Sequence, residues 1–215
     1  METLECIKAR KSIRRFRPDP VPREDITRML EAAAMAPSGA NRQPWKFFVV
    51  MSRELKEKMA EIIKQSCETL PSLLEGVVEN PVQFGDMIKK RLYVVSLFFA
   101  EAPVVFVVCV KEEENFLMTC YTKTGLTSLE ASKKFGYVDV LSGSAATENL
   151  LLAACDLGYG ACWMNVPFMA KDQLEALFCI EPPWQILAFV PVGVPAHDPK
   201  KPPRKKIEDI SVFIY

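Results

Sequence analysis

Five of the eight residues at positions 10–17 are basic, and a serine lies among them. Arginine offers paired N–H donors that match the oxygens of a phosphate, and a serine hydroxyl adds one more donor. The members of this basic segment are Arg10, Lys11, Ser12, Arg14, Arg15 and Arg17. The composition predicts a phosphate site, but a solvated charged turn would have the same residues, and spacing alone does not separate the two.

A second polar group occupies the stretch APSGANRQPW at positions 36–45, between an alanine-rich run and the apolar segment KFFVVM. Pro37 and Gly39 force a non-helical path, while Pro44 and Trp45 belong to the scaffold of an extended exit. Donors and acceptors come from Ser38, Asn41 and Gln43. Amide side chains that carry both suit a neutral heteroaromatic ring. An elaborate turn between helix and strand is the alternative interpretation.

Weaker signals lie later in the chain. Gly158 and Gly160 in LGYGACW allow close backbone approach, although a helix end explains at least one of them. The basic run Arg204, Lys205 and Lys206 would add a second arm to a phosphate site. No Gly-x-Gly-x-x-Gly follows a strand and no Walker lysine motif occurs, so Rossmann and P-loop nucleotide binding are not supported. A single histidine, His197, argues against a His-based zinc site and a Ser-His-Asp triad.

Composition bounds the class of protein. The chain has 215 residues, 49% of them apolar and 25% charged, which fits one globular domain. Basic and acidic residues both number 27, so the zero net charge and the lack of interleaved aromatics argue against nucleic acid as a partner. Seven cysteines without a Cys-x-x-Cys pair, and no signal-peptide core at the N-terminus, predict free thiols in the cytoplasm.

Residues 92–110 are apolar except for one charge, and they pose the question of a membrane span. Glu101 would fall near the bilayer centre, at a cost of roughly 2.5–3.5 kcal/mol. Pro103 also disfavours helical geometry at the residue before it. The segment therefore predicts a helix that ends near Ala100, a sharp turn and a buried strand, not a membrane helix.

The remaining pattern predicts one α+β domain with helices around a four- or five-stranded sheet. Thr3, Pro22 and Ser52 are expected to begin helices, and Ser142 or Ser144 a further helix that Gly158 ends. Residues 111–137 are weakly periodic and give no assignment. Expected strands are KFFVVM, VVFVVCV, ACWMNVP, QILAFVPVGVP and the terminal VFIY, and expected helices include 84–99 and MAKDQLEALF.

Taken together, RKSIRRF, APSGANRQPWKF, ATENLLLAACDLGYGACW and a late Gly-x-Pro followed by Arg-Lys resemble the FMN-dependent nitroreductase family. The match covers nearly the whole chain in the expected order. The resemblance implies one domain over residues 1–215 with a mixed, mostly antiparallel sheet. It also implies a domain-swapped homodimer with two FMN sites at the interface, in which the tail, about 196–215, packs on the partner subunit.

The resemblance also implies roles for individual residues. Arg10, Lys11 and Ser12 would hold the FMN phosphate and ribityl chain, with Arg204 and Lys205 completing the phosphate cage. Arg14 would lie at the pyrimidine edge, where reduction develops negative charge. Bordering the ring and the partner's cofactor would be Pro37, Ser38, Gly39, Asn41 and Gln43. Backbone groups of Met164 and Asn165 would approach the N5 side of the ring.

The implied activity is electron transfer from NADH or NADPH through flavin N5 to a nitroaromatic or quinone in a ping-pong cycle, with no catalytic side chain named. Two alternatives stay open. The same scaffold serves dehalogenation, flavin breakdown or azoline oxidation, and the basic segment could instead define a non-enzymatic anion- or nucleic-acid-binding module. This sequence has Val166 where family members often carry glycine, and residues 111–137, with Phe116, Met118 and Tyr121, fall where the family varies its substrate cover.

Overall fold

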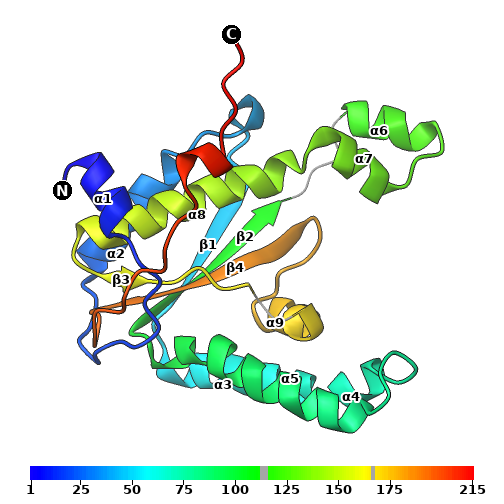
Figure 1. Cartoon of the computed structure of the whole chain (residues 1–215), viewed down its shortest axis with the longest axis horizontal. Helices are drawn as coiled ribbons and strands as arrows, with labels where there is room; N and C mark the ends of the chain where they lie inside the picture. Colours follow the sequence, from blue (N-terminus) through cyan, green and yellow to red (C-terminus); the bar gives the residue numbers. More distant parts are fainter. Residues whose placement is uncertain (112–115, 166–167) are drawn as a thin grey trace.

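The core of the protein is a four-stranded antiparallel sheet in the order β1-β2-β4-β3 (Figure 1). We describe it from a computed structural model, which covers residues 1–111, 116–165 and 168–215. The strands are β1 Trp45–Val50, β2 Val104–Lys111, β3 Gly160–Ala161 and β4 Trp184–Gly193. The predicted α+β class is confirmed. The strand expected over ACWMNVP is reduced to β3 and one isolated bridge, from Met164 to Phe189.

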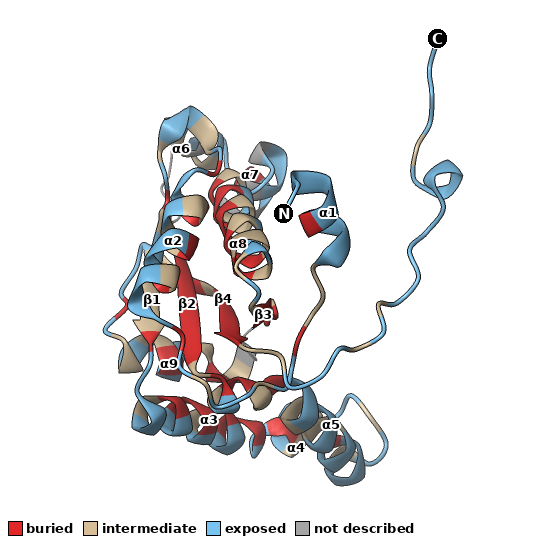
Figure 2. Ribbon diagram, turned by 90° about the vertical axis from the view of Figure 1, so that its left-hand side faces the viewer, coloured by how far each residue is buried: buried red, intermediate tan, exposed pale blue. Residues whose placement is uncertain are grey.

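Helices cover both faces of the sheet (Figures 1 and 2). On β2, Val105 and Val107 pack into a cluster with α3, whereas Val104 and Phe106 on the other face pack with α2 and α8. A strand buried on both faces needs apolar residues throughout, which explains the unbroken VVFVVCV. The helices are α1 Thr3–Ala9, α2 Arg23–Ala34, α3 Arg53–Cys67, α4 Leu70–Leu73, α5 Pro81–Ser96, α6 Phe116–Lys123, α7 Ser128–Phe135, α8 Val138–Asp156 and α9 Lys171–Leu177.

Several predicted helix ends differ from those observed. Ser52 caps α3, as expected, by accepting a hydrogen bond from the Leu55 N–H. The predicted Ser142 or Ser144 cap is wrong, because α8 begins at Val138 and both hydroxyls donate to carbonyls one turn back inside the helix. Thr3 is likewise the first helical residue, with Glu2 at the N-cap position. Pro22 precedes α2 by one residue.

The apolar segment 92–110 divides into helix, turn and strand as expected, although the helix ends earlier than the predicted Ala100. Helix α5 ends at Ser96, a 3-10 turn spans Phe98–Glu101, and β2 follows. Among the described residues, no helix combines the length and apolarity that a membrane span requires. The unassigned residues 111–137 contain α6 and α7, which pack on each other beyond the start of α8 (Figure 1).

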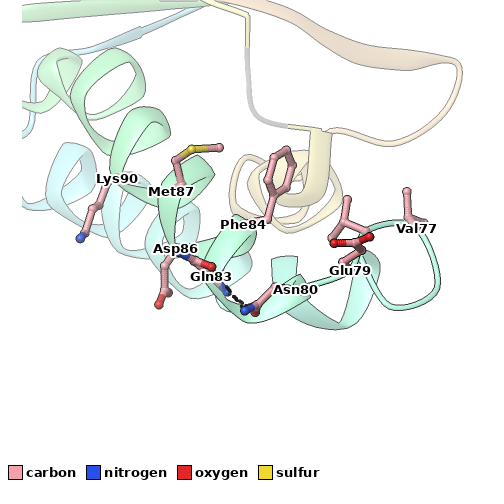
Figure 3. Close-up of a pocket in the computed structure, with 9 residues that line it drawn as sticks. Val77, Glu79, Asn80, Gln83, Phe84, Asp86, Met87 and Lys90 are labelled. Atoms are coloured by element: carbon pink, nitrogen blue, oxygen red, sulfur yellow. Dashed lines mark hydrogen bonds between the residues drawn. The ribbon is translucent and has the colours of Figure 1, made fainter.

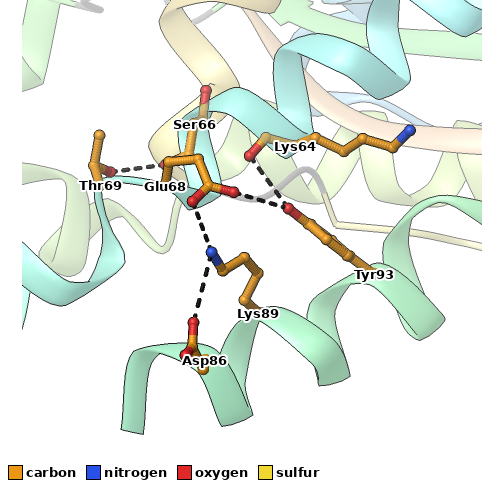
Figure 4. A network of polar contacts seen from close by, with 7 residues as sticks. All are labelled: Lys64, Ser66, Glu68, Thr69, Asp86, Lys89 and Tyr93. Atoms are coloured by element: carbon orange, nitrogen blue, oxygen red, sulfur yellow. Dashed lines mark hydrogen bonds and ion pairs between the residues drawn. The ribbon is translucent and has the colours of Figure 1, made fainter. Parts of the chain in front are cut away.

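A polar network fixes α5 against the end of α3 (Figure 4). The Lys89 ammonium lies 2.7 Å from a Glu68 carboxylate oxygen, and the Tyr93 hydroxyl donates to the same carboxylate at 3.4 Å. The hydrogen bond from Lys89 holds the pKa of Glu68 below its usual value. The Glu68 side chain is 63% exposed and the Lys89 side chain 18%, so solvent screens the ion pair on one side, and the network mainly orients the two helices.

The C-terminal residues leave the body of the protein (Figure 2). The Ala196 N–H donates to the Arg15 carbonyl, and the Lys201 ammonium donates to the Lys8 carbonyl at the end of α1. Beyond these contacts a 3-10 turn spans Ile207–Asp209. The strand expected over VFIY is absent from the described chain, and its side chains are exposed.

A partly buried hydrogen bond joins Tyr159, just after α8, to Asp25 of α2, and its contribution can be tested. The Tyr159 hydroxyl donates to the Asp25 carboxylate at 2.7 Å, and burial together with this bond raises the pKa of Tyr159 to about 12. A raised pKa means that the contribution to stability is complete below the ordinary pKa of 10 and is lost as pH rises toward 12. We expect alkaline titration of phenolate absorbance to show a late component that Tyr159→Phe diminishes, while Tyr93, whose pKa burial also raises, still titrates late. A wild-type titration without that late component would contradict the expectation.

Candidate active site

The basic segment runs along β3, at the edge of the sheet. Ser12 forms a parallel bridge with Ala161, and the Ile13 N–H donates to the Ala161 carbonyl at 2.9 Å. Gly160 makes this approach possible, because a Cβ there would lie 2.6–2.8 Å from three side-chain atoms of Ile13. On its other side, Phe16 bridges to Pro195 at the start of the tail. The segment is therefore held from two sides by backbone pairing.

The cations of this segment divide into two groups. Arg10 lies 3.5 Å from Glu148 and Lys11 forms an ion pair with Asp198. Arg14 and Arg15 are exposed and form no ion pair with a described residue, although the Arg14 guanidinium lies 6.0 Å from the centroid of the Phe98 ring. The second group thus offers positive charge that no carboxylate of the described chain neutralises.

The strand edge beside Ser12 also carries the predicted residues Met164 and Asn165. Both backbone groups of Met164 pair with Phe189, at 2.9 and 3.0 Å, and its side chain is buried. Asn165 is exposed. A ligand beside this edge would therefore meet Asn165 and not the N–H of Met164. Val166, whose effect on this contact the sequence left open, lies outside the described residues.

The polar loop at residues 38–43 has an unusual backbone. Ala40, Asn41 and Gln43 all have positive φ, which non-glycine residues seldom adopt. The Ser38 hydroxyl accepts from the Gln43 N–H at 3.0 Å, and the Gln43 amide donates to Asn41 at 3.3 Å. Pro37, Asn41 and Gln43 are exposed. The loop presents its amides to the surface in a fixed arrangement.

Within one chain the loop and the basic segment lie at opposite ends of the sheet. The loop leads into Trp45, which pairs with Val110 at the end of β2. Ser12 pairs with Ala161, which in turn pairs with Val192, and Val192 pairs with Val104 at the start of β2. The six residue steps of β2 from Val104 to Val110 separate these ends by roughly 20 Å. One chain therefore does not bring the two predicted halves of the site together.

Arg204 and Lys205, the expected second phosphate arm, are exposed and form no ion pair with a described residue. They follow Lys201, which contacts carbonyls at the end of α1. Three residues of chain span at most about 10 Å, and that is the length that separates Arg204 from Lys201.

Comparison with known proteins identifies the group to which this fold and these residues belong. Residues 7–194 match the profile described as the Nitroreductase family. The chain belongs to the nitroreductase family. It is therefore an oxidoreductase, and the family expected from the four sequence motifs is confirmed.

Individual members of the family are similar over most of their length. A Methanothermobacter thermautotrophicus protein with the provisional name NADH dehydrogenase/NAD(P)H nitroreductase is 33% identical over 93% of this chain and 80% of its own. An iodotyrosine deiodinase from Danio rerio is 30% identical over 95% of this chain, which spans 64% of that relative. The crystal structure of a BluB-like flavoprotein from Clostridium difficile 630 covers 100% of both chains with 32% identity and a TM-score of 0.88.

Two of the hollows on the described part of this nitroreductase-family chain bear on the site. One, of about 360 Å³, lies between α1, α8 and β3 and includes Arg10, Lys11 and Asp198 in its lining. The other, of about 960 Å³, lies along the start of α5, where Phe84 and Met87 line it (Figure 3). Of these two hollows, the predicted site residues line the first.

Sequence reasoning did not find the carboxylates that contact the predicted cations. Glu148 and Asp198 stand far from residues 10–17 in sequence, and Asp139 contacts Arg42 of the polar loop. A lone acidic residue carries no motif, so only the register of the sheet and the path of α8 reveal these pairs.

Proposed function

We propose that the protein is an FMN-dependent oxidoreductase that uses NADH or NADPH to reduce an electron-poor acceptor, a nitroaromatic or a quinone. The observation that carries this proposal is the row of cations beside β3, in a chain that matches a flavoprotein structure over its full length. When bound, FMN would accept hydride at N5 and pass the electrons on. The protein then needs to bind and orient the flavin and its substrates, and it needs no acid–base pair of side chains.

The chemistry of the residues fits an FMN phosphate and ring. Ser12 offers a hydroxyl, and Arg14, Arg204 and Lys205, which form no ion pair with a described residue, offer charge-assisted donors. Arg10 and Lys11 already contact Glu148 and Asp198, so a phosphate would compete with these carboxylates for them. Arg14 would place a cation near the pyrimidine edge, and Asn165 would border the N5 side.

The separation of the two half-sites supports a homodimer with a composite site. Loop residues Pro37, Ser38, Gly39, Asn41 and Gln43 would then border the ring held by the other subunit's basic segment. Exposed apolar side chains that suit a subunit contact occur on α1 and on the tail, and they include Leu4, Ile7, Ile207, Phe213 and Ile214. The tail from about residue 196 would pack on the partner.

Flavin content tests this function. We expect purified protein to show a flavin absorption spectrum, bleached by NADH without oxygen and restored by a nitroaromatic or quinone. The charge-reversed double variant Arg14→Glu, Arg204→Glu is expected to lower FMN affinity at least about a hundredfold, because two phosphate and ring contacts become repulsive. Flavin fluorescence titration measures the affinity.

The matched control is Arg53→Glu, Lys58→Glu, which reverses two charges on the exposed face of α3. This control is expected to bind FMN as the wild type does. Protein that is colourless and remains so after incubation with FMN would overturn the proposal.

Reductive dehalogenation is a second candidate, because an iodotyrosine deiodinase is 30% identical over 95% of this chain. The two reactions share the flavin and differ in the acceptor. Release of iodide from a halogenated phenol, with poor turnover of nitroaromatics and quinones, would favour dehalogenation.

A further inference from the structure

The polar loop at residues 38–43 rests on the first turns of α8. Arg42 donates to the Asp139 carboxylate at 2.7 Å, and the Gly39 N–H donates to the Ser142 hydroxyl at 3.4 Å. Gly39 also packs closely on Val138, because a Cβ at this position would lie 2.6 Å from a Val138 methyl group. The loop therefore contacts the helix through hydrogen bonds and through apolar packing.

The backbone of this loop needs such support. Left-handed φ at Ala40 and Gln43 is strained, because the Cβ of a non-glycine residue crowds the backbone in that region. Hydrogen bonds inside the loop connect Ser38, Asn41 and Gln43 to one another, but they do not attach the loop to the rest of the protein. The contacts of Gly39 and Arg42 with α8 attach the loop to the rest of the protein.

The ion pair between Arg42 and Asp139 is the stronger of the two attachments. Asp139 is 8% exposed and the Arg42 side chain 26%, so solvent screens the pair only in part. The Nε of Arg42 is buried without a hydrogen-bond partner among the described residues. A buried donor without a partner is costly, so this ion pair carries a polar cost along with its attraction.

We propose that Arg42 and Asp139 are positioning residues, which hold the exposed amides of Asn41 and Gln43 in the orientation that a flavin ring requires. This inference rests on the proposed function for the identity of the ring. The order of the loop itself does not depend on that function. Because α8 follows α7 after the left-handed Tyr137, the ion pair also ties the loop to the point where the α6–α7 segment joins the core.

The test measures loop order and flavin binding separately. In the FMN-free Arg42→Met variant, we expect the backbone amides of Asn41 and Gln43 to exchange with deuterium at least about tenfold faster than in the wild type. The amides of β2 should keep their wild-type exchange rates. The dissociation constant for FMN is expected to rise at least about tenfold, with an altered visible circular dichroism of the flavin that remains bound. Arg42→Lys, which keeps the charge, should fall between wild type and Arg42→Met.

The matched control is Arg53→Met, which removes an arginine from the exposed ion pair with Glu57 on α3. It should change neither the exchange of the loop amides nor FMN affinity. Wild-type exchange at residues 41 and 43 in Arg42→Met, even with a lowered melting temperature, would overturn the positioning role. If Arg42→Met does not fold, the same readouts in Arg42→Lys decide. Failure of the wild type to bind FMN would overturn the proposed function instead, because the exchange measurement needs no flavin.

Discussion

Replacing Gly160 with alanine is expected to lower FMN affinity at least about tenfold and to reduce the free energy of unfolding by about 1–3 kcal/mol. The added Cβ would lie 2.6–2.8 Å from Ile13 atoms, among them the Ile13 Cβ, which no rotamer change can move. The strand pairing of Ser12 and Ile13 with Ala161 must therefore shift. The donors that we propose for the FMN phosphate lie on the basic segment, so a shift of that pairing would displace them together.

Loss of stability alone must be distinguished from displacement of the segment. Leu174→Ala supplies the control, because Leu174 is fully buried in the cluster on the other face of the sheet. It should destabilise the fold by about 2–5 kcal/mol and leave FMN affinity unchanged at a temperature where both variants are folded. Chemical denaturation and flavin fluorescence titration provide the two measurements. An unchanged FMN affinity in Gly160→Ala would show that phosphate binding does not depend on the pairing with β3.

The local sequence pattern was sufficient to predict elements whose burial shows directly in their run of residue types. The unbroken apolar run VVFVVCV predicted a buried strand, and in the structure helices cover both of its faces. Pro103 marked the boundary between this strand and the helix before it. The start of α8 could not be predicted in this way. Ser142 and Ser144 have the residue type of a cap, but their hydroxyls bond inside the helix, and the true start at Val138 follows a weakly periodic stretch.

The candidate site shows a different limit. Residue types identified the cations and the amides, but their separation depends on the strand order, which the sequence pattern did not provide. The terminal VFIY shows the same limit in another form. A strand needs a neighbouring strand to pair with, and the described chain offers none to these residues. Pairing between distant elements, within a chain or between chains, decides both outcomes.

The placement of the half-sites at opposite ends of one sheet leads to a strong prediction about mixed dimers. One variant, Arg14→Glu with Arg204→Glu, damages the basic segment, and a second, Asn41→Asp with Gln43→Glu, damages the loop. Neither homodimer is expected to retain FMN. A purified heterodimer of the two should regain about half the flavin of the wild-type dimer, because one of its two sites combines an intact segment with the other subunit's intact loop.

The flavin content of the heterodimer distinguishes a site built within one chain from a site built between two chains. If the segment and the loop of the same chain formed one site, every site in the heterodimer would contain one damaged half, and no flavin would return. Differently tagged subunits allow the heterodimer to be isolated, and its absorption spectrum gives the flavin content per dimer. A mixed dimer of the segment variant with wild type is the control, and it should also hold about half the wild-type flavin under either arrangement. Recovery in the first heterodimer therefore requires that the loop of one chain serve the basic segment of the other.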